Sequence, residues 1–113
     1  MNQQYNNYNF ESAWHKVDSL ERKGLYKSAL KIVDEIYIEA DKLSNGGQKI
    51  KSLFYKGKYT NYLAEDNLES FEKILRKEIS KSVFPDKQLY QSILAEFYDK
   101  YLEANIWKIQ KRT

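Results

Sequence analysis

The chain has no cysteine, one histidine, one proline and four glycines among its 113 residues. Without cysteine it cannot build a disulfide framework, a thiol nucleophile, a zinc ribbon or an iron–sulfur cluster. Because His15 is the single histidine, a two-histidine metal site is excluded and a serine triad would depend on this residue alone. We therefore expect neither a metal nor a cofactor, and we expect His15 to be a solvated residue on a helix surface.

Long apolar runs and a one-sided charge are also missing. No apolar stretch approaches the ~20 residues that span a bilayer, so we expect no membrane insertion by this segment. The net charge is +3, but 19 basic and 16 acidic residues are interspersed along the chain. A local excess at Lys108, Lys111 and Arg112 is too short and too terminal to fill a groove, so we expect no nucleic-acid partner.

Apolar residues recur at helical spacing on both sides of Gly24. On the N-terminal side they are Trp14, Val17 and Leu20, and on the C-terminal side they are Leu25, Ala29, Val33, Ile36 and Ala40. The join leaves almost no room for a loop, so the two helices must run antiparallel with their apolar stripes in contact.

Start and stop signals predict where each helix lies. Residues 1–8 are polar and rich in asparagine, which indicates a flexible leader. Asn9 is a good N-cap for the first helix, and Gly24 supplies the left-handed residue that closes it. The second helix then extends to about residue 43 or 44, where the run Ser44-Asn45-Gly46-Gly47 is the strongest helix breaker in the chain.

Three further helices follow by the same reasoning. The third is expected over residues 48–64, with Gly57 on or beside its apolar face as a point of close approach. The fourth starts at the cap formed by Asp66 and Glu69 and ends at residues 82–85, where Pro85 opens the fifth. The apolar face expected for the fifth helix consists of Leu89, Ile93, Phe97 and Tyr101.

Together these segments predict an all-α protein with about five antiparallel helices, forming a single domain over residues 9–113. Gly24, Tyr26 and Ala29 have the spacing of the turn in a tetratricopeptide repeat. The ~34-residue period of such repeats does not return, so the prediction is an irregular TPR-like array or bundle.

Ten tyrosines are spread along the chain, and their most economical role is at the rims of helix contacts. An alternative is a stand-alone adaptor that binds a peptide or protein in a concave groove lined by tyrosines. That alternative predicts that at least three of five rings converge on one open surface: Tyr55, Tyr59, Tyr62, Tyr90 and Tyr98.

Groups that could perform catalysis do not assemble in the sequence. The carboxylate pair Asp34 and Glu35 diverges around a helix, and the pair Glu65 and Asp66 falls at a cap. The Gly46-Gly47 pair lacks the lysine and the hydroxyl residue of a phosphate-binding loop. We therefore expect a protein that is not an enzyme.

Several segments follow one another along the chain: Trp14-x-x-Val17-Asp18-Ser19-Leu20-Glu21-x-Lys23-Gly24-Leu25, residues 27–30, 51–59, 84–88 and 92–98, and the closing Trp107-Lys108-Ile109-x-x-Arg112-Thr113. In this order they resemble the helical N-terminal region of large bacterial alpha-2-macroglobulin-like proteins. The resemblance covers nearly the whole chain from Trp14 onward.

This resemblance implies a structural or interaction module of an exported, protease-entrapping protein in the periplasm or cell envelope, where the helical region precedes β-sandwich macroglobulin domains. It implies protein partners, either the adjacent macroglobulin domains or another envelope protein, and the module would serve as a spacer or docking platform. Trp107 and Ile109 could then pack at the junction with the next domain, or they could seal the last helix onto its own core. The bait region and the thioester of that family have no counterpart in this stretch.

Overall fold

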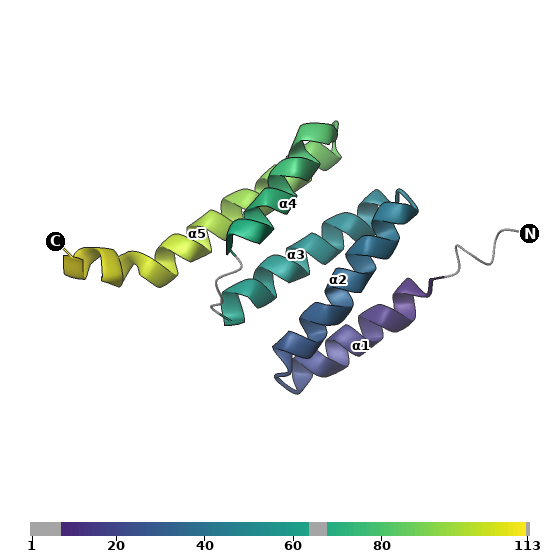
Figure 1. Ribbon diagram of the computed structural model, residues 1–113, viewed down its shortest axis with the longest axis horizontal. Coiled ribbons are helices and arrows are strands. Elements are labelled where there is room, and N and C mark those ends of the chain that lie inside the picture. The colour runs from purple at the N-terminus through teal and green to yellow at the C-terminus, as the bar shows by residue number, and fades with distance from the viewer. Residues whose placement is uncertain (1–7, 64–67, 113) are drawn as a thin grey trace, which may run out of the picture. The chain divides into compact units, whose positions relative to one another are not determined.

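The computed structural model describes residues 8–63 and 68–112, with the side chains of residues 8–63 and 69–100. This described part contains five helices and no strand, which confirms the predicted all-α class (Figure 1). The helices are α1 (Phe10–Arg22), α2 (Tyr26–Lys42), α3 (Gly46–Leu63), α4 (Leu68–Lys81) and α5 (Asp86–Arg112). Apart from Tyr8, the predicted leader lies outside the described residues.

Contacts between the helices divide them into two units. In the first unit α2 packs against both α1 and α3, and in the second unit α4 packs against α5. Within each unit, helices that are adjacent in sequence run in opposite directions (Figure 1). The single domain expected over residues 9–113 stays a prediction.

The α1–α2 hairpin forms as its caps predict. Asn9 accepts a hydrogen bond from the Ser12 amide at 2.9 Å, and Glu11 lies in the positively polarised first turn of α1. Gly24 has a φ of 74°, a conformation that L side chains rarely adopt. The amides of Gly24 and Leu25 donate to the carbonyls of Glu21 and Leu20, both at 2.9 Å, so the last carbonyl groups of the helix are satisfied.

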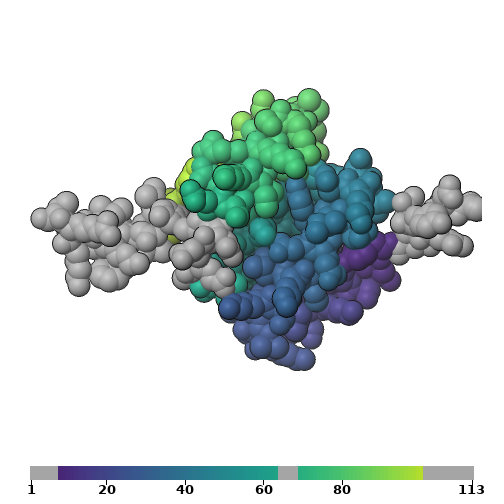
Figure 2. All heavy atoms as spheres, in the orientation of Figure 1, coloured from purple at the N-terminus to yellow at the C-terminus, as the bar shows by residue number. Residues whose placement is uncertain are grey.

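The two predicted apolar stripes of this hairpin are buried or half-buried except at Leu25, whose expected place in the stripe was wrong because it precedes the first turn of α2 and is 48% exposed. The buried cluster consists of Ala13, Trp14, Val17, Ala29, Val33, Ile36 and Tyr59, and in Figure 2 the atoms of α1 and α2 meet without a gap. A fully buried valine or isoleucine contributes about 1.5–3 kcal/mol relative to an exposed one. These residues therefore supply most of the attraction between the two helices.

The break between α2 and α3 differs from its prediction. Both Gly46 and Gly47 lie in the first turn of α3, and the left-handed residue is Ser44, with a φ of 53°. Asn45 explains the difference, because its amide donates to the Ala40 carbonyl at 2.8 Å while its side chain accepts from the Gln48 amide at 3.2 Å. The same residue therefore closes one helix and caps the next, and the glycines are not needed for the turn.

In the second unit, Phe71 and Leu75 of α4 and Tyr90 and Phe97 of α5 are buried. The rings of Phe71 and Phe97 meet edge to face with their centroids 4.7 Å apart. The predicted apolar face of α5 was partly wrong, since Leu89 is 47% exposed and its neighbour Tyr90 is buried in its place. The predicted cap at Asp66 lies outside the described residues.

Replacing Gly24 with alanine tests the left-handed turn. The substitution forces a side chain into an unfavourable backbone conformation, and we expect a loss of about 1 kcal/mol in the free energy of unfolding. Gly47→Ala is the matched control, because an added Cβ would meet only the Asn45 side chain at an ordinary 3.8 Å and would remove a flexible residue from a helix. Urea denaturation followed by circular dichroism measures both, and equal effects would contradict the role of Gly24.

A candidate protein-binding face on α3

Two side-chain contacts fix α3 against α1. Near one end, Trp14 Nε1 donates to Gln48 Oε1 at 2.7 Å, and the Trp14 ring lies 4.9 Å from the Tyr55 ring, centroid to centroid. Seven residues further along α1, the Glu21 carboxylate accepts from the Tyr59 hydroxyl at 2.6 Å and from Lys58 Nζ at 3.1 Å. Because the contacts are two turns apart, they hold the orientation of α3 as well as its position.

The Glu21 contact is strengthened by its surroundings. The Tyr59 ring is fully buried while its hydroxyl reaches the carboxylate. The hydrogen bond from Tyr59, aided by Lys58, holds the pKa of Glu21 below its ordinary value. Burial and the nearby carboxylate raise the pKa of Tyr59 well above its ordinary value. Tyr59 therefore stays a neutral donor and Glu21 stays a charged acceptor across the physiological pH range.

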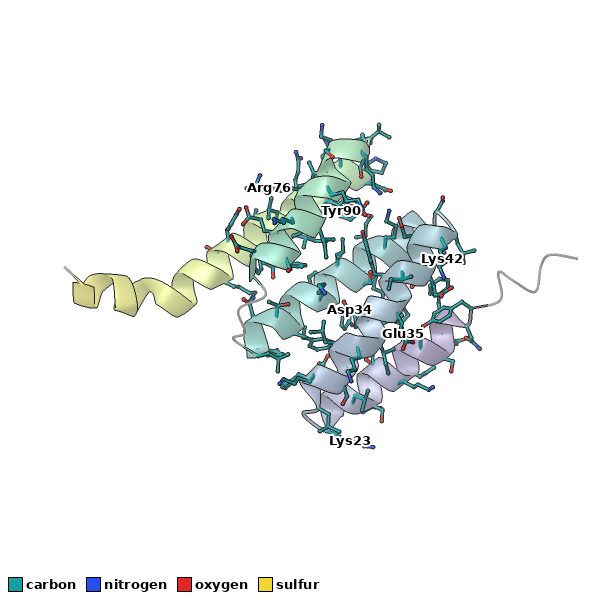
Figure 3. All side chains as sticks on the ribbon, in the orientation of Figure 1. Lys23, Asp34, Glu35, Lys42, Arg76 and Tyr90 are labelled. Atoms are coloured by element: carbon teal, nitrogen blue, oxygen red, sulfur yellow. The ribbon has the colours of Figure 1, made fainter. Side chains whose placement is uncertain are left out.

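Helix α3 carries four lysines and no acidic residue. Lys49 pairs with Asp41 at 3.0 Å, and Lys56 pairs with Asp34 at 2.6 Å. Asp34 is labelled in Figure 3. Lys58 is paired with Glu21. Lys51 instead lies over the Trp14 ring, with Nζ 4.4 Å from the ring centroid, and among the described residues it meets no carboxylate.

One side of α3 presents cations and aromatic rings to solvent. Lys51, Phe54, Lys58 and Tyr62 follow one another at spacings of three and four residues, so they align along the helix, and we call them the α3 stripe. Phe54 is 46% exposed and Tyr62 is 55% exposed. Each of these rings packs against a second aromatic ring. The centroids of Phe54 and Tyr55 are 5.9 Å apart, and those of Tyr62 and Tyr26 are 4.8 Å apart.

The five tyrosines predicted to line a peptide groove do not share one exposed surface. Tyr59 and Tyr90 are buried in the cores of different units, which corrects their predicted place on a binding surface. Tyr55 is half-buried between Trp14 and Tyr59, and Tyr62 alone among the three on α3 is exposed. Tyrosines at helical spacing can lie in a buried core or at the rim of a helix contact. The number and spacing of the tyrosines therefore could not distinguish these two locations.

Tyr98, the fifth of these tyrosines, belongs to a hydrogen-bonded network inside the second unit. Its hydroxyl donates to the Glu72 carboxylate, and Arg76 donates to Glu72 and to the Tyr98 hydroxyl, both at 2.8 Å. These hydrogen bonds, that from Tyr98 foremost, lower the pKa of Glu72. The network joins α4 to α5, as the Glu21 contact joins α1 to α3, and its members already satisfy one another.

The other residues and sites considered in the sequence form no further binding surface among the described residues. α5 continues through Trp107 and Ile109, whose side chains lie outside the described ones, so their role at a domain junction stays a prediction. His15 is exposed on α1. In the described part of the chain, no three histidine or acidic side chains lie close enough to share a metal ion. Of the helices in that part, none has the length and apolarity to cross a membrane.

The sequence contains a signal for the α3 stripe that its overall charge balance conceals. Residues 42–64 include Lys42, Lys49, Lys51, Lys56 and Lys58 and no aspartate or glutamate. Counting charges by helix and not over the whole chain would have found this segment. Which of its lysines lack a carboxylate partner could not be read from the sequence, because the partners are on α1 and α2.

Comparisons of the chain with protein-family models, with curated proteins and with solved structures find no match.

Replacing Tyr59 with phenylalanine tests the electrostatic contact. Because folding lowers the pKa of Glu21, its contribution to stability is complete above the ordinary carboxyl pKa and is lost as the pH falls through the lowered value. Without the Tyr59 hydroxyl we expect the pKa of Glu21 to rise toward its ordinary value, which an NMR titration of the carboxyl carbons measures. Tyr98→Phe is the matched control, and it should move Glu72 and leave Glu21 unchanged. An unchanged Glu21 in Tyr59→Phe would contradict the assignment.

Proposed function

We propose that this protein is a non-catalytic helical interaction module, and that the α3 stripe binds an acidic segment of a partner protein. One observation carries the proposal: Lys51 lies over the Trp14 ring with no carboxylate among the described residues, next to the exposed ring of Phe54. Exposed aromatic rings beside a cation are typical of protein contact surfaces, where they supply apolar area and orient an anionic partner.

Pre-organisation favours binding at this site. Trp14 is buried and hydrogen-bonded to Gln48, so the ring beneath Lys51 is fixed. Lys51 therefore loses less side-chain freedom on binding a carboxylate than a freely rotating lysine does. The stripe extends over eleven residue steps of helix, roughly 16 Å at ~1.5 Å per residue, which matches about five residues of an extended segment.

A protein partner fits this surface better than a nucleic acid. Specific and non-specific binding to a nucleic acid both depend on several phosphate contacts made by lysine or arginine. The stripe has two lysines, and Lys58 already has Glu21 as its partner. One available ammonium group with two exposed rings is better matched to a short acidic segment that carries apolar side chains.

The setting that we propose for the module is a cell-envelope alpha-2-macroglobulin-like protein, and this rests on the sequence resemblance from Trp14 onward. There the acidic segment would belong to an adjacent macroglobulin domain or to an envelope partner. The second candidate is a stand-alone TPR-like adaptor that binds through the α3 stripe and not through the tyrosine-lined groove first expected, because Tyr59 and Tyr90 are buried. The antiparallel α1–α2 hairpin with Gly24 at its turn and α3 as the next helix favour it, and the α3 stripe would serve as its contact surface.

Reversing the charge of Lys51 tests the binding face. We expect Lys51→Glu to weaken binding of a labelled peptide of alternating glutamate and phenylalanine by roughly tenfold or more, because it replaces attraction by repulsion. Phe54→Ser should weaken binding at all salt concentrations, whereas the effect of Lys51→Glu should shrink as salt rises. Fluorescence anisotropy measures both effects.

Lys31→Glu on α2 is the matched control, since it makes the same charge change at another exposed lysine. It should alter peptide binding far less than Lys51→Glu. Equal losses in the two variants would show attraction to net charge alone and would contradict the proposed face. Tighter binding to labelled oligothymidylate than to the peptide would contradict the choice of a protein partner.

A further inference from the structure

The turn between α4 and α5 exposes an apolar surface that the α3 stripe does not include. Val83 is 76% exposed and Phe84 is 77% exposed, and Leu89, in the first turn of α5, is 47% exposed. We call these three residues the turn tip. Pro85 follows Phe84 directly, which restricts the backbone that presents the ring. The tip therefore offers large apolar side chains at the end of a helical hairpin.

Three lysines flank this tip along the chain. Lys77 and Lys81 are exposed and lie one turn apart at the end of α4, and Lys87 lies in the first turn of α5. The nearby acidic side chains neutralise only part of this positive charge. Glu78 is 1% exposed with its carboxylate 3.8 Å from Lys81 Nζ, and Asp86 is half-buried at the start of α5. The charge that faces solvent around the turn tip is therefore mainly positive.

We propose that the turn tip docks reversibly on an anionic lipid surface. Apolar side chains at the end of a hairpin can enter the boundary between headgroups and acyl chains, where a flat protein surface would leave them partly exposed. Lysines beside them keep their ammonium groups at the level of the headgroups and are attracted by anionic lipids. The contact is interfacial, since no described helix can cross a membrane.

A contact of this size is weak by itself. Three apolar side chains bury less area than one acyl chain, which alone gives only marginal, reversible membrane binding. The tip would therefore orient the protein at a surface or add to another attachment. This inference does not depend on the α3 stripe, because the two surfaces belong to different units.

The test is co-sedimentation of the whole chain with vesicles of phosphatidylcholine containing about one third phosphatidylserine, with phosphatidylcholine alone as comparison. We expect binding to the anionic vesicles and little to the neutral ones. The double variant Val83→Ser with Phe84→Ser should reduce the bound fraction at least roughly fivefold, and Lys81→Gln should reduce it less and in a salt-dependent way.

Ile38→Ser is the matched control, because Ile38 is 52% exposed on α2 and lies in the other unit. It should leave vesicle binding unchanged, and circular dichroism should show that each variant keeps its helix content. Equal binding by the tip variant and the wild type, or no binding by the wild type, overturns the proposal. Dimers that the tip variant abolishes, without any vesicle binding, would show a second copy as the occupant and would also overturn it.

Discussion

The position of α3 relative to α1 depends on Tyr59, the one described side chain that belongs both to the buried cluster of the first unit and to its contact with Glu21. Its ring is fully buried among residues of α1 and α2, and its hydroxyl donates to Glu21 at 2.6 Å. An apolar residue at this position could fill the core but could not donate a hydrogen bond to a carboxylate. A shorter polar residue could neither fill the core nor reach the carboxylate. Burial of the Glu21 carboxylate opposes its charge, but the hydrogen bonds from Tyr59 and Lys58 outweigh this cost and keep its pKa lowered.

The exposed chemistry of the first unit follows from this constraint. Once Tyr59 and Trp14 fix the rotation of α3, Lys49 and Lys56 are directed toward the carboxylates of α2, and Lys51 is directed toward the Trp14 ring. Three of the four lysines of α3 then pair with carboxylates of their own unit, and Lys51 meets none among the residues that the structure describes. The exposed rings of Phe54 and Tyr62 lie along the same line. The binding face is therefore a consequence of how the core is packed.

The second unit joins its helices with the same kinds of side chain, a tyrosine, a glutamate and a cation. Tyr98, Glu72 and Arg76 join α4 to α5 as Tyr59, Glu21 and Lys58 join α1 to α3. In both cases a tyrosine hydroxyl and a cation converge on one carboxylate. Such contacts give a pair of helices a preferred register, which apolar stripes alone do not, because apolar contacts tolerate sliding.

Local signals predicted most of the fold. The cap at Asn9, the left-handed Gly24 and the apolar stripes of the first two helices are short-range features, and each is found where it was expected apart from the exposed Leu25. Prediction failed where one residue could serve two roles. Asn45 made the paired glycines unnecessary for a turn, and Tyr90 displaced Leu89 from the core because an amphipathic ring can take either position.

The binding face was harder to predict because it depends on pairing between helices. The lysines of α3 are evident in the sequence, but their partners Asp34, Asp41 and Glu21 are distant along the chain and could only be assigned from the packed helices. The prediction of a tyrosine-lined groove failed for a related reason. Sequence spacing shows which face of a helix a residue is on, but not whether another helix covers that face.

The most direct test of this account is a double-mutant cycle between Glu21 and Tyr59. Glu21→Gln, Tyr59→Phe and the combined variant would be compared with the wild type by urea denaturation at neutral pH. If the hydroxyl–carboxylate contact holds α3 in place, the two substitutions should be coupled by about 1–2 kcal/mol. Losses that simply add, with a coupling energy near zero, would contradict the claim that this contact determines the position of α3.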